Sequence, residues 1–218
     1  GQAGLLINTG NFKIMIDPYL TDSAAEINPK NHRRIPADKR FFNEKPDIIL
    51  ITHEHADHYD PETLRRLLDN NKSTTVLAPY NAWKKIMLQQ DPHNYVMFNR
   101  GTLWTHKGIV FTAVKAEHSD LTAIGCIIND GRQKLYITGD TLYNRDIFAD
   151  LPNDIYSVFL PINGTGNNMN IEDAKKFALK TGAEFAVPLH WGMFDNINPR
   201  EFNIKNAVIP KIYEQILF

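Results

Sequence analysis

Residues 47–58 read DIILITHEHADH, and the interpretation of the whole chain starts from this stretch. Residues 48–51 are an unbroken apolar run, which predicts a strand buried within a sheet. The next residues place three imidazoles and two carboxylates within six positions. Functional loops of α/β proteins tend to lie at the ends of strands. We therefore expect residues 53–58 to form a site at the edge of that sheet.

The spacing within this polar segment suits metal binding. His53 and His55 are two residues apart, so their side chains point the same way in an extended segment. Asp57 and His58 follow where the chain bends into a helix predicted to begin at Pro61, and they can face an adjacent point. Imidazole nitrogen and carboxylate oxygen suit Zn²⁺, Fe and Mn²⁺. The chain has eight histidines, so three in six positions make a chance surface turn a poor explanation.

Three later polar residues follow apolar runs in the same manner. His118 comes after GIVFTAVKAE, Asp140 after KLYIT, and His190 after EFAVPL. One such residue alone indicates only a capping or surface group. Together with the polar segment, the repetition predicts that these side chains meet at one sheet edge.

The chain as a whole predicts an α/β layered fold in one domain over residues 1–218. Residues 5–17 predict a hairpin with a turn at Thr9-Gly10-Asn11, and residues 22–46 predict a long surface loop. Helices are predicted over residues 60–71, 81–90 and 170–182, and a last helical region is expected to begin at residues 198–202. Trp83, Ile86 and Met87 are predicted to face inward.

Composition limits the partners and the compartment. The net charge is −1, so no broad positive field indicates nucleic acid or an anionic membrane. No apolar run reaches the roughly 20 residues that span a bilayer, and no secretory signal is visible. Cys126, the single cysteine, lies in an apolar run and is predicted to be a buried structural thiol. We expect a cytoplasmic protein; whether residues precede Gly1 and whether the chain forms a homo-oligomer stay open.

These motifs resemble the metallo-β-lactamase superfamily, over nearly the whole chain. The residues that carry the likeness are ITHEHADH, GDT and PLHWG, with GQAGLLI and IDPYL as opening strands. The resemblance implies an αββα four-layer sandwich with two divalent ions, Zn or Mn, at one edge. It implies two sets of ligands and one bridging carboxylate: His53, His55 and His118 for the first ion, Asp57, His58 and His190 for the second, and Asp140 between them.

Within that superfamily the chain looks most similar to the branch of the L-ascorbate-6-phosphate lactonases. The segments GQAG, LPINGTGNNMNIEDA and PLHWGMF carry this likeness, and the last is also similar to the N-acylphosphatidylethanolamine phospholipase D type. The chain is shorter than expected for ascorbate lactonases, so lactonase-like describes it better than that one substrate.

A hydrolytic function follows from the resemblance and from metal chemistry. Two divalent ions can hold a bridging water and lower its pKa toward about 7, giving a hydroxide nucleophile. We expect Asp57 and His190 to act in catalysis, and Asp17 and Thr141 are candidates to orient metal ligands. The predicted substrate is a small lactone, ester or phosphorylated sugar-acid derivative. A phosphodiesterase acting on lipid or nucleotide, and a non-catalytic metal-binding protein, are the alternatives.

Substrate contacts are predicted from the loop PINGTGNNMN and from the residue after His190. The loop carries four asparagines and two glycines, so it can offer amide donors and bare backbone N–H groups to a hydroxyl-rich or phosphorylated ligand. We single out Asn163, Asn168 and Trp191, whose indole can form a pocket wall or belong to the core.

Overall fold

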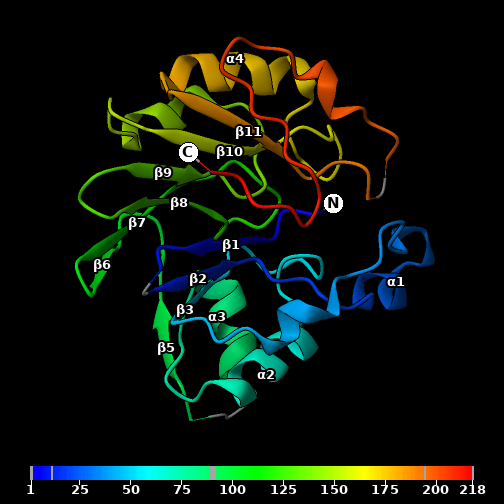
Figure 1. Cartoon of the computed structure of the whole chain (residues 1–218), viewed down its shortest axis with the longest axis vertical. Coiled ribbons are helices and arrows are strands. Elements are labelled where there is room, and N and C mark those ends of the chain that lie inside the picture. Colours follow the sequence, from blue (N-terminus) through cyan, green and yellow to red (C-terminus); the bar gives the residue numbers. More distant parts are fainter. Residues whose placement is uncertain (1, 11, 89–91, 194, 218) are drawn as a thin grey trace.

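The computed structural model describes residues 2–10, 12–88, 92–193 and 195–217, and its strands form two sheets (Figure 1). The first sheet has the order β1-β2-β3-β4-β5, with these bounds: β1 Leu5–Asn8, β2 Lys13–Ile16, β3 Ile48–Leu50, β4 Thr75–Ala78 and β5 Asn94–Met97. The second has the order β11-β10-β9-β8-β7-β6, with these bounds: β6 Leu103–His106, β7 Ile109–Lys115, β8 Ile124–Asn129, β9 Lys134–Ile137, β10 Ser157–Pro161 and β11 Phe185–Leu189.

Strand directions bring several chain segments to one edge. In the first sheet β1 and β2 are antiparallel, and β2, β3, β4 and β5 run parallel. In the second sheet β9, β10 and β11 run parallel, while β6 to β9 alternate. The carboxyl ends of parallel strands lie at the same edge of a sheet, so the segments after β9 and β11 emerge at one edge, on either side of β10.

Helices cover the outer faces of both sheets (Figure 1). In Figure 1, α4 (Ile171–Thr181) lies over β10 and β11, while α2 (Pro61–Asn70) and α3 (Tyr80–Met87) lie on the far side of the first sheet. The short α1 (Ser23–Ile27) lies beside these layers. Four 3-10 helices complete the described elements: η1 Pro29–Asn31, η2 Lys39–Asn43, η3 Arg145–Asp150 and η4 Pro199–Glu201.

Three apolar clusters fill the spaces between these layers. One joins the facing sides of both sheets, and includes Ile14, Ile48 and Phe111. A second packs α4 against the second sheet, and a third packs α2 and α3 against the first. Burial of apolar surface at about 25 cal/mol per Å² makes these three interfaces the main stabilisation of the fold. The arrangement confirms the predicted αββα sandwich.

Most predicted elements are present, and four expectations need correction. Residues 22–46 contain three short helices rather than an unbroken loop, and the region at residues 198–202 holds only one 3-10 turn. Met87 is 42% exposed, whereas Ala82 faces the core in its place. The strand β5 was not predicted, because its four residues, NYVM, are too short an apolar stretch to indicate a strand. Asn11 of the predicted turn and residues 89–90 of the predicted helix lie outside the described residues.

The remaining structural expectations concern the thiol and the membrane. Cys126 is fully buried in the inter-sheet core, and burial raises its pKa, so this thiol has the character of an inert core residue. Among the described residues, no helix combines the length and apolar character needed to cross a bilayer.

An Asp150→Asn substitution tests how η3 is tied to the second sheet. Asp150 accepts hydrogen bonds from Arg100 Nε at 2.7 Å and from the Lys115 backbone N–H at 2.8 Å. The Arg100 bonds hold the pKa of Asp150 below its usual value. We expect Asp150→Asn to lower the free energy of unfolding at pH 7 by about 1 kcal/mol, because the exposed Arg100 half of the pair is screened by solvent.

The same comparison has a defined pH dependence. A carboxyl whose pKa is lowered in the folded state contributes stability above its unfolded pKa, and that stability is lost as the pH falls through the folded value. The difference between wild type and Asp150→Asn should therefore shrink below about pH 4 in urea unfolding series. A difference that stays constant from pH 7 to pH 3 would show that the Asp150 charge contributes nothing.

Candidate metal centre

The seven predicted donors meet at the edge between the two sheets. His53, His55, Asp57 and His58 lie in the segment that follows β3. The other three each follow a strand of the second sheet: His118 after β7, Asp140 after β9 and His190 after β11. Five donors are buried, and His55 and Asp57 are partly exposed. The sequence prediction that these segments converge is consistent with this arrangement.

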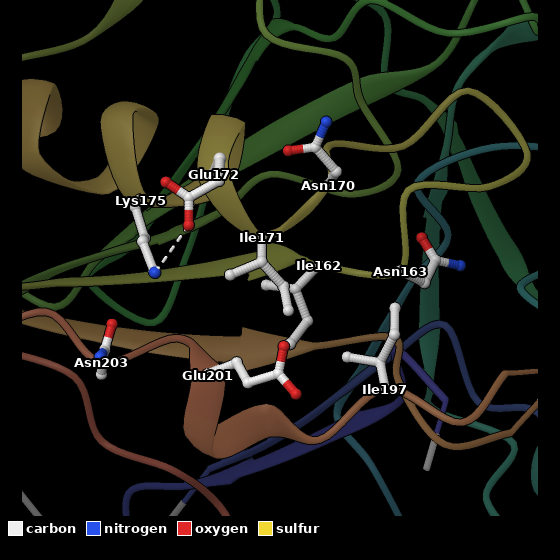
Figure 2. Close-up of a pocket in the computed structure, with 9 residues that line it drawn as sticks. All are labelled: Ile162, Asn163, Asn170, Ile171, Glu172, Lys175, Ile197, Glu201 and Asn203. Carbon is white, nitrogen blue, oxygen red and sulfur yellow. Dashed lines mark hydrogen bonds and ion pairs between the residues drawn. The ribbon is translucent and has the colours of Figure 1, made fainter.

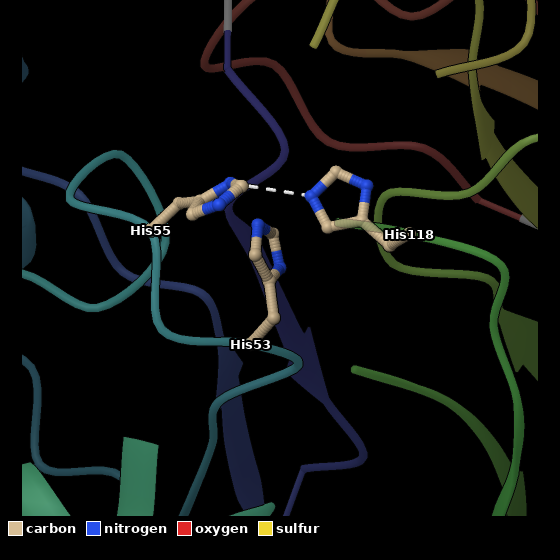
Figure 3. A group of neighbouring side chains, drawn as sticks. All are labelled: His53, His55 and His118. Carbon is tan, nitrogen blue, oxygen red and sulfur yellow. Dashed lines mark hydrogen bonds between the residues drawn. The ribbon is translucent and has the colours of Figure 1, made fainter. Parts of the chain in front are cut away.

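His53, His55 and His118 form the first group of donors. Each offers one ring nitrogen, and these nitrogens lie within 4.8 Å of one another. His118 Nε2 is 3.2 Å from His55 Nδ1, and the His53 ring centroid is 4.6 Å from that of His55 (Figure 3). Figure 3 shows the three rings pointing toward one another, two from the segment after β3 and one from the segment after β7. Three converging imidazoles are a suitable ligand set for a zinc-like ion.

Asp57, His58 and His190 form the second group. The ligand atoms again lie within 4.8 Å of one another. Asp57 Oδ2 is 3.4 Å from His190 Nε2 and 3.8 Å from His58 Nε2. A carboxylate with two imidazoles adds oxygen to the donor set, which suits Zn²⁺ and Mn²⁺ alike.

Asp140 lies between the two groups. Its Oδ1 is 3.3 Å from His58 Nε2, and its Oδ2 is 3.3 Å from His190 Nε2. Asp140 also forms a triad with His53 of the first group and His58 of the second. Both measured contacts are to the second group, and the shared cluster with His53 brings the same carboxylate to the first group, which is the position of a bridging ligand.

The backs of two imidazoles are held by Thr52 and Asp17. His58 Nδ1 is 2.8 Å from Asp17 Oδ2, and His53 Nδ1 is 3.1 Å from Thr52 Oγ1. Asp17 also accepts hydrogen bonds from the Thr52 backbone N–H at 2.7 Å and from Thr52 Oγ1 at 2.6 Å. In both rings Nδ1 is engaged, so Nε2 is left free to bind a metal ion. Hydrogen bonds of this kind orient histidines that bind metals.

Buried residues at the two ends of the asparagine-rich loop support the donors, while residues 164–167 between them are exposed. Asn168 Nδ2 donates to Asp140 Oδ2 at 2.8 Å, and the Asn167 carbonyl oxygen is 3.3 Å from His118 Nδ1. Asn168 is 4% exposed, so its side chain is largely withdrawn from solvent. Asn168 thus contacts a predicted ligand, and the expectation that it contacts substrate stays a prediction.

Asn163 holds the back of His190 in the same way. Its side-chain Nδ2 lies 2.9 Å from His190 Nδ1, and its Oδ1 is buried with no hydrogen-bond partner among the described residues. The two ends of an amide have nearly the same shape, so their assignment follows from the hydrogen-bond network. Placing the oxygen next to Nδ1 gives it the Nδ1–H donor and leaves Nε2 for a metal. Asn163 thus supports His190, and its predicted contact with substrate stays a prediction.

Hydrogen bonds also locate Trp191 and Thr141. Trp191 Nε1 donates to the Pro188 carbonyl oxygen at 3.0 Å, and the ring packs against the cluster beneath α4, so Trp191 belongs to the core boundary. Thr141 Oγ1 accepts from the Glu117 backbone N–H at 2.8 Å and donates to the Leu142 carbonyl oxygen. It thus fixes the residue before His118 instead of contacting a ligand directly.

The sequence interpretation missed Asp120, a buried carboxylate two residues after His118. Asp120 Oδ2 accepts from the Glu54 backbone N–H at 3.1 Å, and its Oδ1 accepts from Asn81 Nδ2 at 2.8 Å. These bonds join the polar segment to the beginning of α3 and to the His118 loop. The motif EHSD contained the signal, because an acidic residue beside a predicted ligand is a candidate support.

Unpartnered atoms at the centre fit bound cations. His53 Nε2, His58 Nε2 and Asp140 Oδ1 are buried and have no hydrogen-bond partner among the described residues. Leaving such a group unsatisfied costs about 1–3 kcal/mol, and more for a charge. His58 Nε2 and Asp140 Oδ1 are 3.3 Å apart, which is an ionic contact without hydrogen-bond geometry. Divalent ions would satisfy all three atoms, so these residues fit a dinuclear site.

Charge differs between the two groups of donors. Burial holds the pKa of His53 well below its usual value, and burial also lowers the pKa of His118. Burial lowers the pKa of His190 too, but the carboxylates of Asp140 and Asp57 outweigh it and raise that pKa to about 9. The pKa of Asp140 is held well below its usual value, because the His190 and His58 imidazoles outweigh the effect of burial. Burial therefore favours the neutral imidazoles of His53 and His118 in the first group, whereas the second group holds a compact set of opposite charges.

A cavity of about 620 Å³ borders this centre without containing it. Its lining includes Glu172 and Lys175 of α4, which form an ion pair at 2.8 Å, and Asn163 (Figure 2). None of the seven donors is among the described lining residues. The cavity reaches the centre only through Asn163, so it lies behind His190 and is separate from the donor groups.

An Asn168→Ala substitution tests the support given to Asp140. Removing the amide frees Asp140 Oδ2 from its 2.8 Å hydrogen bond, so the carboxylate loses orientation. We expect metal affinity to fall about 10-fold, with little change in the unfolding temperature of the metal-free chain. Isothermal titration with Mn²⁺ or Zn²⁺ measures the affinity. Asn153→Ala, at an exposed asparagine, is the matched control, and equal affinities for the two variants would contradict this role.

Comparisons with known proteins agree with this architecture. The sequence profile of the family described as Beta-lactamase superfamily domain matches residues 13–191. A UPF0173 metal-dependent hydrolase of Thermoplasma acidophilum is 28% identical over 227 residues, which cover 95% of this chain and 92% of that protein. A UPF0173 metal-dependent hydrolase of Aeropyrum pernix is 27% identical over 222 residues, which cover 93% and 85%.

Solved structures show the same fold at lower identity. A metallo hydrolase from the archaeon Ignicoccus hospitalis has a TM-score of 0.73 and 23% identity, covering 96% of this chain and 91% of that one. An isothiocyanate hydrolase from Delia radicum gut bacteria has a TM-score of 0.77 and 17% identity, covering 100% and 96%. At such identities the likeness supports the fold alone.

Proposed function

This chain belongs to the beta-lactamase superfamily, and from that premise we propose that it is a metal-dependent hydrolase of a small ester or lactone. The observation that carries the proposal is the convergence of seven nitrogen and oxygen donors into two adjoining groups with Asp140 between them. The similarity to proteins named metal-dependent hydrolases supports the reaction class.

The donor residues have different roles in such a reaction. Divalent ions held in a site of this kind supply an activated water and a Lewis acid at neutral pH. Asp57 and His190 hold the second group together, and Asp140 links that group to His53 of the first. His55 and Asp57 are the partly exposed donors, so substrate approaches on their side. The other five donors are buried, so solvent does not reach the sides of their rings and carboxylates that face away from the metal position.

The surroundings of Asp57 support a small substrate with a negatively charged substituent, such as a phosphorylated sugar-acid lactone. Ala56 packs with Tyr19 and Met193 in a small apolar cluster beside the polar segment. The Arg33 guanidinium lies 4.7 Å from the Tyr19 ring centroid, and its nearest hydrogen bond is to the Tyr19 carbonyl oxygen at 2.8 Å. A guanidinium bonded to neutral groups keeps its charge available for an anion such as phosphate.

A hydrolysis screen of the metal-loaded chain tests this function. The chain is loaded with Mn²⁺ or Zn²⁺ and assayed with sugar lactones, their phosphorylated forms, phosphodiesters and nitrocefin. We expect turnover of lactones, with faster turnover of the phosphorylated forms. Asp57→Ala is the control that separates turnover at this centre from background hydrolysis.

The screen also decides between the alternatives. Turnover of lipid or nucleotide phosphodiesters with lactones untouched would replace the acyl substrate by a phosphoryl one on the same centre. Binding of metal with no turnover of any class would indicate a non-catalytic metal-binding protein. Either result would overturn the proposed substrate class.

A further inference from the structure

The side chain of Gln2 lies against the second group of donors. Its amide nitrogen contacts Asp57 Oδ2 and is 3.1 Å from His190 Nε2. Both partner atoms are ligand atoms of one candidate metal position. The amide of Gln2 therefore lies where a further ligand of that metal position would lie. Gln2 and Asp57 are 55 residues apart in the sequence.

Close packing at the start of the chain fixes this position. Ala3 is 8% exposed, and Gly4 packs closely on Asp17, because a Cβ there would come 3.2 Å from the Asp17 carbonyl oxygen. Asp17 is also the residue that holds His58 at 2.8 Å. The backbone next to Gln2 thus packs on the same residue that orients the second group.

The amide oxygen of Gln2 is the atom without a partner. Oε1 is buried and has no hydrogen-bond partner among the described residues. A turn about the last side-chain bond exchanges the positions of the oxygen and the nitrogen at little steric change. An oxygen beside Asp57 Oδ2 and His190 Nε2 would face two acceptors, which is favourable only if a cation lies between them. Amide oxygens are established ligands of hard cations.

We propose that Gln2 is an additional ligand of the second metal position, donating through Oε1 to the ion held by Asp57, His58 and His190. The proposal rests on the proposed function, since it requires that this centre binds metal. A neutral oxygen raises the number of ligands available to the second ion. Zn²⁺ prefers four ligands, whereas Mn²⁺ accepts six with oxygen among them, so Gln2 shifts the second position toward Mn²⁺.

Metal titration of the full chain and of two Gln2 variants tests the proposal. Isothermal titration with Mn²⁺, and separately with Zn²⁺, gives the stoichiometry and the affinity of each ion. Gln2→Ala should weaken binding of the second Mn²⁺ about 10-fold and leave the first unchanged. Gln2→Glu, which keeps an oxygen ligand, should restore the affinity or exceed it. Gln215→Ala, at an exposed glutamine, is the matched control.

A Co²⁺-loaded sample gives a second readout that does not depend on activity. Removal of one ligand from a six-coordinate ion raises the intensity of its visible absorption, so Gln2→Ala should brighten the Co²⁺ spectrum and Gln2→Glu should not. Spectra that match wild type in both variants would contradict ligation by Gln2.

Each other outcome of the titration overturns the proposal in a recognisable way. Unchanged affinity in Gln2→Ala removes Gln2 from the ligand set, and tighter binding identifies Gln2 as a competitor of the ion. Weaker binding in Gln2→Glu than in Gln2→Ala assigns Gln2 the role of a donor to Asp57, because a second carboxylate there would repel the first. A wild-type chain that binds no metal refutes the proposed function itself, which the first titration reveals.

Discussion

Asp57→Ala lowers kcat/KM of the metal-loaded chain by about 10²–10³-fold, the loss typical when a group that stabilises or positions the reacting centre is removed. Asp57 Oδ2 is the only described carboxylate oxygen in the second group, 3.4 Å from His190 Nε2 and 3.8 Å from His58 Nε2. Without it, two imidazoles are left to hold the second ion with Asp140. The measurement is the initial rate on whichever lactone or ester gives turnover in the screen.

The fold should survive this substitution, which makes the rate interpretable. The Asp57 side chain is 18% exposed and belongs to no apolar cluster, so its removal leaves no large core cavity. Circular dichroism and the unfolding temperature of the metal-free chain check this point. Asp69→Ala, at an exposed aspartate of α2, should keep the wild-type rate. A rate for Asp57→Ala within twofold of wild type would remove Asp57 from the mechanism.

Gly139→Ala is expected to destabilise the chain by about 3 kcal/mol, through backbone strain and a steric clash together. Gly139 has a φ of 61°, a conformation that suits glycine. A Cβ at this position would lie 2.8 Å from the Ile124 carbonyl oxygen and 3.0 Å from Thr52 Cβ. These neighbours belong to the segments that carry the donors, so relief of the clash also displaces Asp140. Urea unfolding measures the stability, and metal titration measures the effect on the centre.

A Gly131→Ala variant separates the effect of backbone strain from the effect of the steric clash. Gly131 has a φ of 86°, but no atom lies within 4 Å of an added Cβ. This variant carries the strain without the clash and should lose only about 1 kcal/mol, with metal binding unchanged. Equal losses of stability in Gly131→Ala and Gly139→Ala would show that the close approach of the chain segments at Gly139 is unimportant.

The donors could be predicted from sequence because each of the four segments that carry them follows an apolar run. Burial of such a run as a strand fixes where the next residue emerges, so the segment after β3 and His118, Asp140 and His190 could be assigned to one edge without coordinates. Asp17 could be proposed as a support on the same grounds, since it ends an apolar strand, and the structure places it on His58.

The asparagines could not be assigned in this way. An amide has the same composition whether it faces solvent, substrate or a metal ligand, and only the path of the loop decides among them. Asn163 and Asn168 turn inward because Gly164 has a φ of 64° and its N–H bonds to the Met169 carbonyl oxygen, which folds the loop back on itself. Gln2 was missed for a related reason, because its contacts join residues far apart in the chain.

Crystals of the chain loaded with Mn²⁺ or Zn²⁺, measured at the absorption edge of the metal, test the central claim most directly. The account predicts two anomalous peaks, one among His53, His55 and His118 and one among Asp57, His58 and His190, with ligand distances of about 2.0–2.3 Å. Asp140 should have an oxygen near each peak. Data from fully loaded crystals with no peak at either group, or with ions only at the surface, would contradict it.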